Sequence, residues 1–80
     1  MPRYFFHIRD GKALAKDPEG AEYDSLELAR EEAVKSAREL LSRRVLYGEE
    51  VNGQTFELTD ELGNIAGVVR FRDVLRLRKI

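Results

Sequence analysis

The chain has 80 residues, with 14 Lys and Arg against 15 Asp and Glu, which gives a net charge of −1. This length predicts one small domain over residues 1–80, and the balanced charge excludes a global attraction to nucleic acid or to a membrane surface. The absence of cysteine excludes disulfides, thiol catalysis and cysteine-type zinc sites. No apolar run approaches the roughly 18 residues of a membrane-spanning helix, so we expect a cytoplasmic protein.

Residues 3–9 alternate between two faces, and this period of two predicts a strand. One face holds Tyr4, Phe6 and Ile8, and the other holds Phe5, His7 and Arg9. The following Asp10-Gly11 predicts a type I′ hairpin turn, because both central residues of that turn need a positive φ. Residues 12–16 then return as a short second strand, which a loop at 17–20 ends.

A long helix is predicted from about residue 25 to residue 47. Asp24 is placed to accept hydrogen bonds from the first-turn amides, and Glu27 follows three residues later, as in a capping box. Apolar side chains then recur at intervals of three or four residues, at Leu26, Ala29, Ala33, Ala37, Leu40 and Leu41. Gly48 is a suitable C-terminal stop.

A second hairpin follows the helix. Residues 55–59 alternate as a strand, residues 60–64 form its loop, and residues 65–72 are predicted as the fourth strand. Gly67 lies within that strand and indicates a bulge or a close approach of another element. Residues 73–77 lose the alternation, so we expect 72–80 to be either a helical turn or a flexible basic tail.

The order strand, strand, helix, strand, strand predicts an α+β fold. Such a β-β-α-β-β chain forms a small antiparallel sheet with one long helix packed on one face. The side chains expected to face the helix are Tyr4, Phe6, Ile8, Phe56, Leu58, Ile65, Val69 and Phe71.

The sequence contains no catalytic constellation. His7 is the only histidine and lacks the partners of a triad or a usual zinc site. The acidic segment at residues 17–24 lacks the Asp-x-Asp-x-Asp-Gly pattern of a calcium loop, and the glycines form no phosphate-binding motif. We therefore expect no enzymatic activity, no metal, no cofactor and no small-molecule substrate.

The sheet face opposite the helix is the candidate interaction surface. It is expected to carry Arg3, Phe5, His7, Arg9, Val68, Arg70 and Arg72. Its half-apolar character favours a protein contact, with a second copy in a homodimer or with another protein. The C-terminal segment is a further contact candidate, because no partner is evident for Val74, Leu75, Leu77 and Ile80.

A weak nucleic-acid-binding module is the alternative function. Residues 70–80 hold five Lys and Arg against the single Asp73, a local charge of +4. With the arginines of the outer sheet face, this basic end has the charge that a phosphate backbone attracts.

The opening segment, Met1 to Gly11, resembles that of a family of short, uncharacterised proteins common in rhizobia and other alphaproteobacteria, catalogued as a domain of unknown function. The resemblance continues through Asp17-Pro18-Glu19-Gly20, the Ala- and Glu-rich helix, residues 56–61 with Gly63, and Phe71-Arg72-Asp73. It implies a bacterial, cytoplasmic, stand-alone small domain. It supplies no agreed activity, and so no functional residues.

Overall fold

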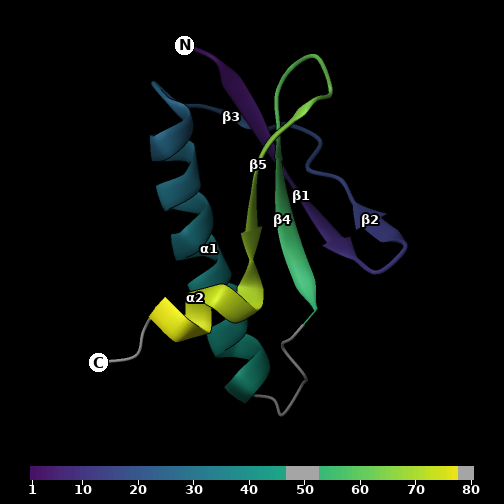
Figure 1. The fold of residues 1–80 in the computed structure, drawn as a ribbon, viewed down its shortest axis with the longest axis vertical. Coiled ribbons are helices and arrows are strands. Elements are labelled where there is room, and N and C mark those ends of the chain that lie inside the picture. The colour runs from purple at the N-terminus through teal and green to yellow at the C-terminus, as the bar shows by residue number, and fades with distance from the viewer. Residues whose placement is uncertain (47–52, 78–80) are drawn as a thin grey trace.

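The structure, a computed structural model, describes residues 1–46 and 53–77. The elements in chain order are β1 (Arg3–Asp10), β2 (Ala13–Ala15), β3 (Ala21–Glu22), α1 (Leu26–Leu46), β4 (Gln54–Thr59), β5 (Ile65–Arg70) and α2 (Phe71–Leu77). Figure 1 shows α1 running along one side of the sheet, and the short helix α2 lying across α1. The predicted α+β fold, an antiparallel sheet with one long helix packed against it, is confirmed.

The sheet has the order β2-β1-β4-β5, and every pairing in it is antiparallel. The first hairpin joins β1 to β2, and β3 pairs with the other end of β1. The turn between β1 and β2 contains Gly11, whose φ is +62°, and Lys12, whose φ is not positive. A positive φ at the first central residue alone indicates type II′, so the predicted type I′ turn is wrong although the hairpin is present.

Helix α1 turns a stripe of small residues toward the sheet. Ala29, Ala33 and Ala37 are fully buried at intervals of four residues, and Leu41 continues the stripe one turn later. Small side chains let the helix lie close to the strands, so that the rings from β1 and β4 fill the space between the layers. The helix is capped by Ser25, whose Oγ accepts the N–H of Leu28 at 3.2 Å, and the predicted cap at Asp24 is therefore wrong by one residue.

The core extends beyond the sheet into α2. The ring of Phe71 lies 5.0 Å from that of Phe56, centroid to centroid, and is fully buried. Val74, one turn along α2, is 1% exposed because α2 packs against α1, β4 and β5. The expectation that Val74 lacks a partner is wrong. So is the placement of Arg72 on a fourth strand, since the chain turns helical at Phe71.

One predicted core residue lies outside the core. Ile65 is 54% exposed, because the pairing of β4 with β5 shifts between Leu58 and Thr59. This irregularity sets Ile65 opposite Thr59, whereas Val69 pairs with Phe56 and stays buried. Of the two alternatives predicted for Gly67, the close approach is confirmed, since a Cβ there would lie 3.0 Å from Nη2 of Arg30 on α1. The register shift also lies beside the Leu58–Gly67 pair.

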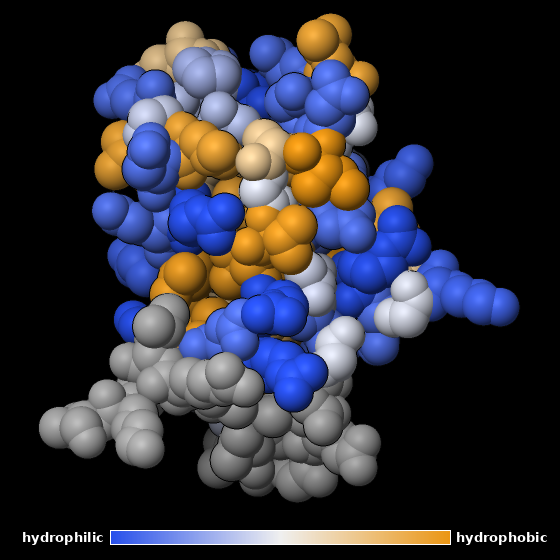
Figure 2. All heavy atoms as spheres, viewed as in Figure 1, coloured by the Kyte–Doolittle hydropathy of each residue, from blue (hydrophilic) through white to orange (hydrophobic). Residues whose placement is uncertain are grey.

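On the face seen in Figure 2, hydrophobic side chains form a band along the middle, between α1 and β5. Within the described part of the chain, no helix is long and apolar enough to cross a membrane. The predicted helix stop at Gly48 and the basic residues Arg78 and Lys79 lie outside the described residues.

Candidate functional site

The sheet face opposite α1, called the outer face below, is ordered in three cross-strand rows. The register places Phe5 beside Thr59, and Thr59 beside Ile65. The next row holds His7, Glu57 and Val68, and the third holds Arg9, Thr55 and Arg70. Five of the predicted surface residues therefore do share one face of the sheet, namely Phe5, His7, Arg9, Val68 and Arg70.

The other two predicted residues lie apart from these rows. Arg3 is at the start of β1, where its guanidinium donates to the carbonyl oxygen of Glu19 at 2.8 Å and lies 3.6 Å from the Glu22 carboxylate. Arg72 is on α2 and is exposed. Arg3 thus fastens the segment before α1 to β1, and neither residue belongs to the central surface of the outer face.

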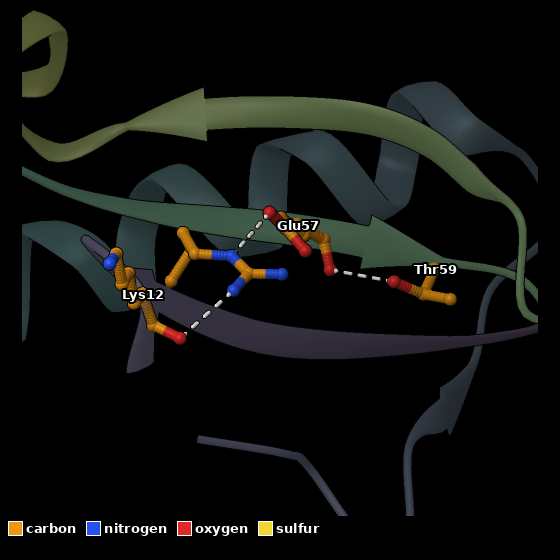
Figure 3. A network of polar contacts seen from close by, with 4 residues as sticks. Lys12, Glu57 and Thr59 are labelled. Carbon is orange, nitrogen blue, oxygen red and sulfur yellow. Dashed lines mark hydrogen bonds and ion pairs between the residues drawn. The ribbon is translucent and has the colours of Figure 1, made fainter. Parts of the chain in front are cut away.

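An ion pair occupies the middle of the outer face (Figure 3). Nε of Arg9 donates to Oε2 of Glu57 at 3.1 Å, and the Glu57 side chain is only 15% exposed. Nη1 of Arg9 also donates to the carbonyl oxygen of Lys12 in the hairpin turn, and the Thr59 hydroxyl donates to the Glu57 carbonyl oxygen. Arg9 therefore joins β1 to β4 and to the first turn, and its charge is balanced within the chain.

A second polar cluster, formed by Asp17 and His7, fixes the loop at residues 16–20. The Asp17 carboxylate accepts the N–H of Phe6 at 3.2 Å, and those of Gly20 and Glu19 at 3.2 and 3.3 Å. The backbone N–H of Asp17 in turn donates to Nδ1 of His7 at 3.1 Å. Because Nδ1 accepts a hydrogen bond, the proton of the neutral imidazole is on Nε2.

Burial and hydrogen bonding act on the Asp17 carboxyl in opposite directions. Partial desolvation raises its pKa, but the hydrogen bonds from Phe6, Gly20 and Glu19, together with the electrostatic effect of the nearby His7, outweigh that increase. The net pKa is lowered from the ordinary value of 3.8. Asp17 is therefore ionised in the folded protein at neutral pH.

We expect the wild-type protein to lose stability in acid as the Asp17 carboxylate is protonated. Asp17→Asn should remove this pH dependence. A lowered pKa stabilises the fold above the unfolded-state pKa of 3.8, and the contribution disappears as the pH falls through the folded-state value. Urea unfolding should show the variant about 1 kcal/mol less stable than the wild type at about pH 6, and progressively closer to it as the pH falls below 3.8. A difference that stays constant with pH would contradict this role of the carboxylate.

The loop at residues 16–20 and the turn between β4 and β5 border an open pocket of about 430 Å³ at one end of the outer face. Phe5 and His7 form part of its lining, with ring centroids 6.0 Å apart. The remaining lining residues are Lys16, Asp17, Pro18, Thr59, Asp60, Glu61 and Gly63. The lining is mainly apolar, while its charged groups comprise three carboxylates and one ammonium.

Within residues 1–46 and 53–77, no group of three or more His, Asp or Glu side chains is arranged to hold a metal ion. Two acidic residues of the 17–24 segment have contacts within the chain. Asp17 binds backbone amides, and Glu22 pairs with Arg3.

The sequence analysis missed the Asp17 cluster and the pocket. An Asp-Pro-x-Gly segment is a signal for a carboxylate that binds nearby backbone amides, as Asp17 does with Glu19 and Gly20. The long-range bond to Phe6 carries no such signal, because it depends on how the loop returns along β1.

Residues 3–72 of the chain match the family described as Domain of unknown function (DUF6894), and the chain therefore belongs to that family. Neither the curated proteins nor the solved structures include a match.

Proposed function

We propose that this member of the DUF6894 family is a non-enzymatic protein-interaction domain that associates with a second copy of itself through the outer face. One observation carries the proposal. Ile65 and Val68 on β5 remain 54% and 45% exposed, while the arginines beside them are paired within the chain. A sheet face that presents apolar side chains with balanced charges favours contact with protein.

The two apolar side chains suit a two-fold arrangement. In a two-fold contact, the same patch meets itself, so that Val68 of one copy packs near Val68 of the other without a like-charge clash. A stable contact buries about 600–1,000 Å² on each copy. That is roughly a tenth to a sixth of the 5743 Å² surface of the chain.

The alternative nucleic-acid function has less support. Arg9 is paired with Glu57, Arg70 with Asp73 at 2.8 Å, and Arg3 with Glu22. A guanidinium that is already paired with a carboxylate gains less from a phosphate, because binding must first break the existing pair.

The bacterial and cytoplasmic setting implied by the resemblance is also part of the proposal.

We expect Val68→Lys to abolish the association. The added ammonium would lie at the centre of the contact, where its desolvation and the like charge of the second copy oppose binding. In sedimentation equilibrium at high micromolar concentration, the wild type should show about twice its 9.2 kDa chain mass, and the variant the mass of one chain.

Leu28→Lys is the matched control. Leu28 is also 45% exposed, but it lies on α1 rather than on the outer face, so this variant should retain the wild-type mass. A monomeric wild type, or an equal loss in both variants, would overturn the proposal. A gel shift with single-stranded RNA at low salt would instead favour the alternative.

A further inference from the structure

We propose that the outer-face pocket binds the basic, partly apolar segment 76–80 of a second copy of the chain. This inference rests on the self-association proposed above and names the segment that would complete it. The segment reads Arg-Leu-Arg-Lys-Ile, with three positive charges and two apolar side chains.

The pocket has matching chemistry. Phe5 and His7 offer two ring faces, and Pro18 adds a further apolar surface beside them. An apolar side chain of the segment, or the aliphatic part of one of its arginines, would lose exposed area on covering these rings. The guanidinium would also gain a cation–π contact. A basic peptide that contains leucine is therefore a better occupant than a polar one.

The charged residues around the pocket favour a cation. Asp17, Asp60 and Glu61 oppose the single Lys16, so the pocket carries a net charge of −2. Asp17 and Asp60 are held in place by backbone amides, since Oδ1 of Asp60 accepts the N–H of Leu62 at 3.0 Å and of Asn64 at 2.8 Å. These fixed carboxylates attract a segment with three positive charges and repel a phosphate backbone.

The position of α2 favours an exchange between two copies. The pocket borders the turn between β4 and β5, whereas α2 follows the far end of β5 and leads away from that turn (Figure 1). The six residues of β5 span roughly 17 Å from first to last, and three residues beyond Leu77 reach at most about 11 Å. Because this reach is shorter than β5, we assign the segment 76–80 to the pocket of a second copy rather than to its own. A two-fold dimer would let each copy supply its segment to the pocket of the other.

The test is a titration of the full chain, labelled with nitrogen-15, with a synthetic peptide of residues 74–80. We expect amide shifts confined to the pocket, at Phe5, His7, Thr59 and Gly63. Glu61→Lys should bind the peptide roughly three- to tenfold more weakly, because the substitution replaces an attraction by a repulsion. Glu39→Lys is the control, since it makes the same change of charge at an exposed site on α1 and should leave the affinity unchanged.

The monomeric Val68→Lys variant separates this inference from the proposed function. The variant should still bind the peptide, because Val68 does not line the pocket. Shifts spread over the surface, or equal weakening by Glu61→Lys and Glu39→Lys, would overturn the inference even if the chain dimerises. Binding confined to the pocket of a wild type that is monomeric would support the pocket as a basic-peptide site and overturn self-association.

Discussion

Phe71→Ala is expected to remove a large part of the stability of the domain. Phe71 is fully buried, and its ring lies against Phe56 where α2 joins the sheet. Truncation of a buried phenylalanine costs about 3–5 kcal/mol, through lost burial and the cavity left behind. A chain of this length has a total stability of about 4–12 kcal/mol. Urea unfolding followed by circular dichroism should therefore show a midpoint far below that of the wild type.

Two further variants make this result interpretable. Leu62→Ala removes a side chain that is 87% exposed, so it should change the free energy of unfolding by less than about 0.5 kcal/mol. Phe71→Leu keeps most of the volume and should lose only about 1–1.5 kcal/mol, which provides a folded comparison if the alanine variant does not fold. All three should be measured at one protein concentration, because association adds to apparent stability. A loss below about 1 kcal/mol for Phe71→Ala would mean that α2 is not part of the core.

The sequence correctly predicted the strands and the helix in which apolar side chains recur regularly because one side of the element is buried. Phe6 and Ile8 in β1, and Phe56 and Leu58 in β4, alternate because every second side chain faces the helix. The spacing of alanines in α1 is likewise set by its contact with the sheet. Such patterns are local consequences of a two-layer fold, so a single sequence reveals them.

The errors occurred where a long-range contact overrides the local pattern. Val69 and Phe71 continue an alternation that predicts a strand, yet the chain becomes helical at Phe71 because this turn buries both Phe71 and Val74. Ile65 also fits the alternation, but the bulge opposite Leu58 and Thr59 moves it out of the core. Gly67 indicated a bulge or a close approach, but the sequence does not show at which residue the register shifts.

The candidate site was predicted as a set of residues but not as a chemical surface. Phe5, His7 and Arg9 were correctly assigned to one face from their period of two. Their partners, Glu57 for Arg9 and the loop at Asp17 for His7, depend on strand register and loop path. This difference bears on the proposed function, because a phosphate must displace the carboxylate before it can bind a paired arginine.

Gly20→Ala is expected to be the most damaging glycine substitution among the described turns. The φ of Gly20 is +64°, and a Cβ there would lie 2.8 Å from both a ring carbon of Phe5 and the carbonyl oxygen of Tyr4. The unfavourable φ costs alanine about 1 kcal/mol. The overlap adds about 1–3 kcal/mol, since the Tyr4 carbonyl belongs to the backbone of β1 and moves only with the strand. Urea unfolding should therefore show a loss of about 2–4 kcal/mol.

Gly11→Ala separates the two causes. Gly11 has nearly the same φ, +62°, but no atom lies within 4 Å of the Cβ position, so only the backbone strain of about 1 kcal/mol should appear. The difference between the two variants then measures the contact of the loop with Phe5 and Tyr4. Because Phe5 lines the pocket, Gly20→Ala should also weaken binding of the 74–80 peptide, whereas Gly11→Ala should not. Equal losses of stability in the two variants would show that the loop moves away from β1 at little cost. In that case the Asp17 cluster would not hold the pocket in one shape.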